Sequence, residues 1–230
     1  MTTPPTVLTE EEELFRQTIR DFAEREIGPR VDKMERDAHY DLAILPMLFD
    51  LGIMGVEIPE KYGGVGLGTL HAGTLLNAVA SCGGAVSAAS TLHISMFGMG
   101  PVIHHGSERM KQQYLPPTAT DELHVSFGIT EDDAGTDTSR IRTTATRDGD
   151  GWIIHGKKIW NTKAQQAQKV LLLARTTPRE ECAKPTDGMT LFLADLDRRS
   201  VEIREIPKLG RKAVNSNELF IEGLPGSADD

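Results

Sequence analysis

The chain has 230 residues, a length that predicts two domains of about 100 to 150 residues each. A hydrophobic share of 39% and a charged share of 26% are typical of a soluble globular protein and exclude a largely disordered chain. The net charge of -9, with acidic residues spread along the sequence, argues against nucleic-acid binding, which needs clustered Lys and Arg.

The N-terminal sequence carries no sign of a targeting segment. Residues 1–5 read Met-Thr-Thr-Pro-Pro, without the basic and apolar regions of a secretory signal or the Arg-rich character of a transit peptide. No apolar run of membrane-spanning length stands out. We therefore expect a cytoplasmic protein without a membrane span.

The first half of the chain predicts helices. Thr9, followed by Glu10, Glu11 and Glu12, is a capping-box pattern, and the helix that it begins is expected to end at Gly28–Pro29. A second helix is expected through Met47–Leu51, with Pro46 in its first turn. Three more helices are expected over 70–81, over 85–97 after the pair Gly83–Gly84, and from Ser107 to Tyr114 before the prolines at 116 and 117.

After those prolines the pattern changes to short, often β-branched runs bounded by turn residues. Asp148-Gly-Asp-Gly151 between two of these runs is a hairpin signal. The runs predict strands over 123–129, 143–146, 152–155, 169–174, 189–194, 201–206 and 218–221. We expect an α+β fold, in which an all-α domain of residues 1–122 precedes a small β-barrel or β-sandwich domain of residues 123–230.

Several patterns that suggest ligand sites in other proteins have simpler explanations in this chain. Cys82 and Cys182 lie too far apart for a CxxC pattern, and the seven histidines lack metal-ligand spacing, so no metal site is expected. The glycines at 63, 64, 66 and 68 lie in no strand-to-helix unit, which argues against a dinucleotide-binding loop and favours a connection between helices.

The most informative segment runs from Phe127 to Asp137 and reads FGITEDDAGTD. It leaves a predicted strand and brings two hydroxyl side chains, Thr130 and Thr136, close to Gly135, where a ligand can approach the backbone closely. The residues alone allow a ligand-binding loop or a polar turn that closes a hairpin, and the second is the commoner structure.

This segment resembles the acyl-CoA dehydrogenase signature, aromatic-x-x-Thr-Glu-x-x-Ala-Gly-Ser-Asp. The matching residues are Phe127, Thr130, Glu131, Ala134, Gly135 and Asp137, with Thr136 in place of Ser. A second segment, residues 156–162 (GKKIWNT), is similar to the family's Gly-x-Lys-x-Trp-Ile-Thr. Three further ordered matches, near residues 26–29, 51–66 and 106–116, make the resemblance specific across almost the whole chain.

The resemblance implies an FAD site made by both segments. In the family, the position of Thr130 hydrogen-bonds the pyrimidine end of the flavin, that of Trp160 packs on the ring, and that of Thr162 lies near N5. Gly135 and Thr136 fall where the FAD pyrophosphate meets the acyl-CoA, so Thr136 is also a candidate substrate contact. The full candidate set for the cofactor is Phe127, Ile129, Thr130, Gly135, Thr136, Trp160, Asn161 and Thr162.

Two departures from the family pattern change the chemistry near this site. Asp132 and Asp133 stand where the family often has Pro with Gly or Asp, and we expect both to point to solvent, since carboxylates repel a diphosphate. Asn161 replaces a residue that is usually apolar, which changes the packing between Trp160 and Thr162.

A larger departure concerns the end of the chain. Family members continue into a C-terminal four-helix bundle that supplies the catalytic glutamate, and this chain ends after its last predicted strand. We expect a fragment, and no catalytic base is nominated in it.

The implied activity is FAD-dependent α,β-dehydrogenation of an acyl-CoA thioester to the trans-2-enoyl-CoA. Electrons then pass to an electron-transferring flavoprotein, and the full-length enzyme is expected to form a homo-oligomer. Two alternatives remain open at this point: a flavin oxidase or monooxygenase of the same superfamily, and a truncated, non-catalytic module that binds flavin or acyl-CoA.

Overall fold

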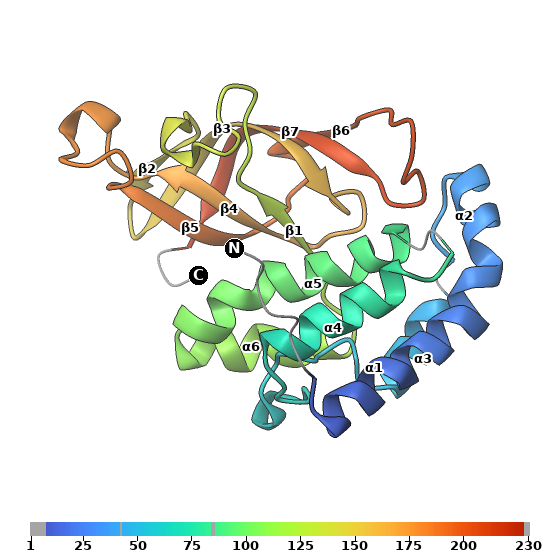
Figure 1. Ribbon diagram of the computed structural model, residues 1–230. Helices are drawn as coiled ribbons and strands as arrows, with labels where there is room; N and C mark the ends of the chain where they lie inside the picture. The colour runs from blue at the N-terminus through green and yellow to red at the C-terminus, as the bar shows by residue number, and fades with distance from the viewer. Residues whose placement is uncertain (1–7, 42, 84–85, 228–230) are drawn as a thin grey trace, which may run out of the picture.

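The computed structural model describes residues 8–41, 43–83 and 86–227. Helices occupy the first half of the chain and a curled, mixed β-sheet occupies the second, with the helices packed along one side of the sheet (Figure 1). The α-helices are α1 Glu10–Phe22, α2 Val31–Asp37, α3 Ile44–Asp50, α4 Thr69–Ala80, α5 Val86–His105 and α6 Glu108–Ala119.

The start of α1 confirms the predicted capping box, but its predicted end is wrong. The Thr9 hydroxyl accepts a hydrogen bond from the Glu12 amide, and the Glu12 carboxylate accepts one from the Thr9 amide. Gly28–Pro29 does not stop the helical path: a π-helical turn, Ala23–Ile27, and a 3₁₀ turn, Gly28–Arg30, lead directly into α2. Proline is tolerated there because the first turn of a helix needs no backbone donor.

The ends of α5 and α6 also lie beyond their predicted positions. Helix α5 continues to His105 with Pro101 inside it, and α6 includes both Pro116 and Pro117. Leu115 and Ala119 of α6 are buried, so packing keeps the backbone helical past two residues that cannot donate. Of the Gly83–Gly84 pair that is predicted to separate two helices, Gly84 lies outside the described residues.

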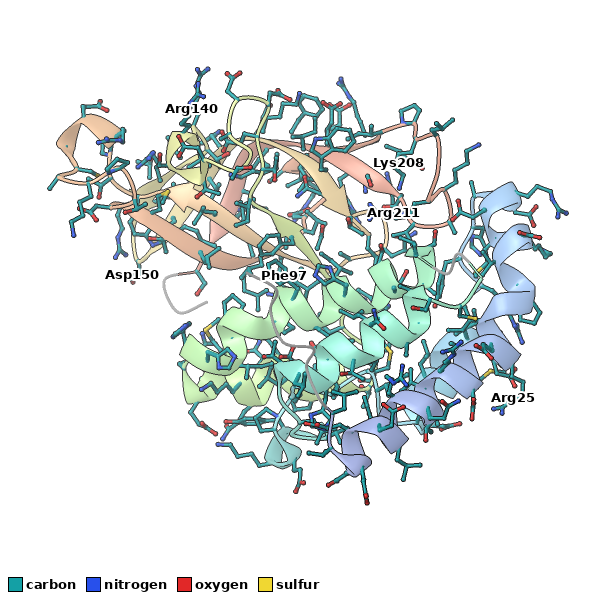
Figure 2. The ribbon with its side chains drawn as sticks, viewed as in Figure 1. Arg25, Phe97, Arg140, Asp150, Lys208 and Arg211 are labelled. Atoms are coloured by element: carbon teal, nitrogen blue, oxygen red, sulfur yellow. The ribbon has the colours of Figure 1, made fainter. Side chains whose placement is uncertain are left out.

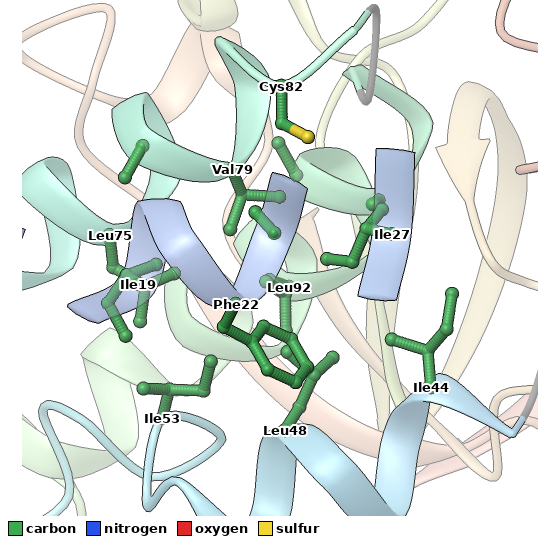
Figure 3. Packing of buried hydrophobic residues seen from close by; sticks show 14 of the residues in the cluster. Ile19, Phe22, Ile27, Ile44, Leu48, Ile53, Leu75, Val79, Cys82 and Leu92 are labelled. Atoms are coloured by element: carbon green, nitrogen blue, oxygen red, sulfur yellow. The ribbon is translucent and has the colours of Figure 1, made fainter. Parts of the chain in front are cut away.

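The helices share a continuous hydrophobic core (Figure 3). Apolar residues recur on one face of α1 and meet the inner faces of α3, α4 and α5, as periodic spacing requires. The fully or almost fully buried members of this core include Ile19, Ile27, Ile44, Leu48, Ile53, Leu75, Val79 and Leu92.

Helix α5 is the one helix in the described part of the chain that is long and apolar enough to cross a membrane. An 18-residue window of this helix has a mean hydropathy of 1.3, so the expectation that the sequence holds no apolar run of membrane-spanning length is wrong. The protein buries 59% of that window, and α5 contacts α4, α6 and β1. Packing in the protein core therefore accounts for its apolar composition.

All seven predicted strands are present, although two are much longer than predicted. The hairpin is confirmed: Asp148 pairs with Gly151, and Gly149 has the positive φ of 56° that such a turn requires. The strands are β1 Val125–Gly128, β2 Thr144–Asp148, β3 Gly151–Thr162, β4 Lys169–Arg175, β5 Met189–Asp195, β6 Val201–Glu205 and β7 Ser216–Gly226.

The strands form one mixed sheet with the order β1-β4-β2-β3-β7-β6, and β5 pairs with β4. Strands β1 and β4 run parallel, while β3, β7 and β6 are antiparallel neighbours. The sheet curls into a half-barrel, which confirms the α+β class and the helical-then-β order.

Aromatic and polar contacts join the helices to the sheet. Phe97 on α5 lies at the junction between the helices and β1, and Arg211, from the β6–β7 connection, lies near the other end of α5 (Figure 2). Arg211 donates to the Ser90 hydroxyl at 3.1 Å, and the Lys212 amide donates to Glu35 of α2 at 2.7 Å. Polar contacts therefore fix the β6–β7 connection against two helices.

Candidate functional site

Strand β3 ends in an irregular segment that turns Trp160 outward. The pairing of β3 with β7 shifts register between Lys158 and Asn161. Trp160, inside this irregularity, has a φ of 64° and a relative exposure of 56%. Both features are unusual for a large aromatic residue, which normally avoids the left-handed region and is mostly buried.

Aromatic side chains also face one another where α5 meets β1. The rings of Phe97 and Phe127 pack edge to face with centroids 4.8 Å apart, and His93 stacks on Phe97 at 5.2 Å. Phe97 is 51% exposed, so this cluster is accessible to a ligand. The sequence predicts Phe127 as a site residue but not Phe97 and His93, because helical periodicity does not show which exposed residue of a helix borders a site.

The loop after β1 is anchored by a buried carboxylate, Glu131. Its Oε1 accepts from the Thr143 hydroxyl at 2.6 Å and from the Lys158 ammonium at 2.7 Å. Its Oε2 accepts from the Arg142 amide at 2.6 Å. Lys158 also donates to the Ile129 carbonyl at 3.1 Å, so one side chain of β3 holds the backbone on both sides of Thr130.

The electrostatics of this anchor depend on hydrogen bonding. Burial by itself raises the pKa of Glu131, but the bonds from Lys158, Thr143 and the Arg142 amide outweigh it and hold that pKa below its usual value. A carboxylate in this state is a fixed acceptor and not an acid-base group at neutral pH. Glu131 and Lys158 therefore serve to position the loop.

Asn161 lies on the inner side of the same segment. Its side chain is fully buried, and its amide Nδ2 donates to the Phe127 carbonyl at 2.9 Å. A Cβ at Gly128 would come within 3.1 Å of that amide and within 2.9 Å of the Leu172 Cδ1, so any larger residue there would displace one of these side chains. The Asn161 side chain is thus directed into the protein and away from the exposed face of Trp160.

The other candidate residues lie at the rim of this surface. Thr130 is half-buried, and its carbonyl accepts from the Ile159 amide at 2.9 Å. Gly135 and Thr136 are exposed, and a Cβ at Gly135 would meet nothing within 4 Å. The Thr162 carbonyl accepts from the Ser126 hydroxyl at 2.9 Å, which fixes the end of β3 against β1. Hydrogen bonds therefore hold the two sequence motifs side by side, and the contact of each candidate residue with a flavin stays a prediction.

The two aspartates that depart from the family pattern point to solvent, as predicted. Asp132 and Asp133 are exposed, and they form ion pairs with Lys157 at 2.9 Å and with Arg142 at 3.3 Å. Their negative charges are therefore partly compensated at the surface.

The donors on this surface suit a planar heterocycle better than a metal. It presents an exposed indole, the Phe127–Phe97 pair, threonine hydroxyls and a glycine-containing loop. Within residues 8–41, 43–83 and 86–227, no cluster of three His, Cys, Asp or Glu side chains could hold a metal ion. Aromatic faces stack on a ring system, while hydroxyl and amide groups bond its polar edge.

A helical region followed by a curled half-barrel, with this surface at the end of β3, defines the architecture of the first two domains of an acyl-CoA dehydrogenase. The sequence matches the acyl-CoA dehydrogenase N-terminal domain over residues 9–122 and the middle domain over residues 126–224. The chain belongs to the acyl-CoA dehydrogenase family.

Individual relatives agree with this assignment. The chain is 30% identical over 221 residues to "Probable acyl-CoA dehydrogenase YngJ" of Bacillus subtilis, with 94% of this chain and 56% of that protein covered. It is 29% identical over 217 residues to the 3-(aryl)acrylate reductase of Clostridium sporogenes, with the same coverage. The chain therefore spans about half the length of the curated relatives that it matches.

A solved structure extends the similarity to the fold. The glutaryl-CoA dehydrogenase of Mycobacterium smegmatis in complex with FADH2 aligns with a TM-score of 0.83 and 26% identity. The alignment covers 96% of this chain and 55% of that one.

Proposed function

We propose that this chain supplies the flavin-facing surface, and part of the acyl-CoA-facing surface, of an FAD-dependent enzyme. The proposed reaction is α,β-dehydrogenation of an acyl-CoA thioester to the trans-2-enoyl-CoA. The observation that carries the proposal is the exposed Trp160, held at a positive φ next to the anchored loop 129–137. Strain and exposure together at one aromatic residue are expected at a ligand site.

Bound FAD would supply the hydride acceptor for this reaction. The residues present fit that group, since the exposed Trp160 and the glycine-containing loop 129–137 lie on segments that are hydrogen-bonded to each other. Trp160 would cover the ring and exclude water, and the Thr130 hydroxyl would donate to its polar edge. Thr162 and the backbone of Ile129 and Asn161 would complete the ring contacts.

The exposed end of the loop would serve the charged parts of the ligands. Gly135 allows close approach of a pyrophosphate to the backbone, and the Thr136 hydroxyl would donate to the pyrophosphate or to the acyl-CoA. Phe127 and Phe97 would form an apolar wall beside the thioester. We assign no catalytic base within this chain.

The remaining parts of the proposal concern partners. Electrons would leave to an electron-transferring flavoprotein, and the full-length enzyme would be a cytoplasmic homo-oligomer. The name of the Clostridium sporogenes relative, a reductase of arylacrylates, supports redox chemistry at a carbon-carbon double bond in that relative.

The first test is flavin binding by the chain itself. In a Trp152→Phe variant, Trp160 is the only tryptophan, since the sequence contains two. Titration with FAD should quench its fluorescence saturably. Thr130→Val should weaken this binding, whereas Thr146→Val, on the exposed side of β2, should leave it unchanged.

The second test is turnover by the longest natural polypeptide that contains this chain, with a panel of acyl-CoAs and an artificial electron acceptor. Enoyl-CoA formation with slow reoxidation by air is the expected result. Rapid reoxidation would instead favour a flavin oxidase or monooxygenase, and binding without turnover would favour a non-catalytic module. Absence of flavin binding in both preparations would overturn the proposal.

A further inference from the structure

A separate cavity of about 340 Å³ lies between the helices and the sheet. Residues 38–40, after α2, and Thr91 of α5 form its helical side, while His124, Lys163 and the β6–β7 connection at Val214 form the other. Its volume is within the range of pockets that bind small molecules. None of the residues proposed to contact the flavin is among those that line it.

Lys163 is a buried cation in the wall of this cavity. Its relative exposure is only 8%, and its ammonium Nζ lies 2.8 Å from His124 Nδ1. Other lysines of the β region pair with carboxylates: Lys158 with Glu131 at 2.7 Å, and Lys169 with Asp195 at 2.9 Å. In the described part of the chain, no carboxylate forms such an ion pair with Lys163.

Burial lowers the pKa of Lys163, and the nearby charge of Asp121 opposes this only in part. Asp121 itself contacts His124, with Oδ1 3.3 Å from Nδ1, and it does not line the cavity. Buried charges in proteins are normally paired. The lysine therefore lacks the counter-charge that its position calls for.

Tyr40 supplies a second unsatisfied group in the same wall. Its relative exposure is 8%, and its hydroxyl has no hydrogen-bond partner. Burial, followed by the charges of Asp121 and Asp41, raises the pKa of Tyr40, so the hydroxyl keeps its proton and remains a donor. The surrounding atoms close this oxygen off from the cavity, so the wall must shift slightly before water or a ligand can reach it. A buried hydroxyl without a partner is destabilising, which favours such a shift when an acceptor is bound.

We propose that this cavity binds a small organic monocarboxylate, whose oxygens accept hydrogen bonds from the Lys163 ammonium and, once the wall shifts to uncover it, from the Tyr40 hydroxyl. One anion then supplies both the missing counter-charge and the missing acceptor. Ala38, Ala213 and Val214 provide apolar wall for a short carbon chain. Glu205, which also lines the cavity and is exposed, disfavours ligands of higher negative charge.

The test is isothermal titration calorimetry of the full chain with sodium butyrate, with butyramide as a neutral probe of the same size. Butyrate should bind saturably, and butyramide should bind at least tenfold more weakly, because a charge-assisted hydrogen bond is about twice as strong as a neutral one. The proposal would be overturned if butyrate in large molar excess over the protein gave no saturable heat of binding. Equal affinity for butyrate and butyramide would overturn it as well.

Two variants assign the binding to this cavity. Lys163→Met keeps the length of the side chain and should weaken butyrate binding at least tenfold, while Lys184→Met, at an exposed position outside the cavity, should not change it. Tyr40→Phe keeps the ring, should weaken binding several-fold, and remains informative if Lys163→Met does not fold. Unchanged butyrate affinity in a folded Lys163→Met variant contradicts the assignment. If only Tyr40→Phe folds, unchanged affinity in that variant contradicts it.

Discussion

Near the C-terminal end of strand β3, Lys158 and Asn161 are fully buried, whereas Trp160 between them is more than half exposed. The inner side is polar and fixed by hydrogen bonds, and the outer side is aromatic and uncovered, which reverses the usual pattern of a strand. The hydrogen bonds of the inner groups hold the backbone in shape, and they leave the outer face uncovered for the proposed ligand. Substitutions on the inner side should therefore lower the free energy of unfolding, and substitutions on the outer side should lower the affinity for FAD.

The largest effect is expected from Lys158→Met on the inner side. It leaves the Glu131 carboxylate buried without its cation, which should lower the free energy of unfolding by about 3 to 5 kcal/mol. Urea denaturation measures this. Lys157→Met, which breaks a more exposed pair with Asp132 and Glu218, is the matched control and should lower the stability far less.

The double variant Lys158→Met with Glu131→Gln sharpens this test. Removal of the carboxylate charge should recover a large part of the stability lost in Lys158→Met, because no unpaired charge then remains buried. Equal instability of the single and double variants would show that shape, and not charge, decides the effect.

Asn161→Ala should have the next largest effect on stability. It leaves the part-buried Phe127 carbonyl without the amide donor at 2.9 Å, but it also removes the buried Asn161 Oδ1, which has no partner, so the expected loss is about 1 to 2 kcal/mol. Thermal unfolding followed by circular dichroism gives the change. A loss below about 0.5 kcal/mol would mean that this side chain does not anchor β1 to β3.

Glu131→Gln should show a smaller effect that depends on pH, because the amide keeps an oxygen that can accept from Lys158 and Thr143. The folded-state pKa of Glu131 is lowered, so its ionised form contributes stability that is fully present above the unfolded pKa of about 4.3. This contribution is lost as the pH falls through the folded pKa. The difference in unfolding free energy between wild type and Glu131→Gln, about 1 to 2 kcal/mol at pH 7, should shrink steadily below pH ~4.

Trp160→Ala, on the outer side, should have the smallest effect on stability. An exposed side chain contributes little to folding, and the expected change is within about 0.5 kcal/mol. Its FAD affinity, followed by the fluorescence of the flavin, should fall at least tenfold. A stability loss above about 1.5 kcal/mol with unchanged FAD affinity would make Trp160 a structural residue and break the contrast between the two sides.

Much of the fold could be predicted from local patterns. The capping box at Thr9, the turn at 148–151 and the seven β runs are all signals within a few residues, and each is found in the structure. The misplaced helix ends, at Gly28–Pro29 and at Pro116–Pro117, show where tertiary packing overrides local propensity.

The site was only partly predictable. Both motifs were visible as residue patterns, but the bond from Lys158 to Glu131 and the contact of Phe97 with Phe127 join segments 27 and 30 residues apart. The cavity at Lys163 was not predicted, because its wall combines residues from the whole length of the chain.

The sequence by itself determined the order of helices and strands, the two motifs and the outward direction of Asp132 and Asp133. Those features depend on local backbone preference, on hydrophobic periodicity and on the cost of burying charge. Only the tertiary structure decided that Trp160 faces outward, that Asn161 faces inward and that Lys163 and Tyr40 share one cavity. These depend on register shifts and on contacts between distant segments, which no local pattern encodes.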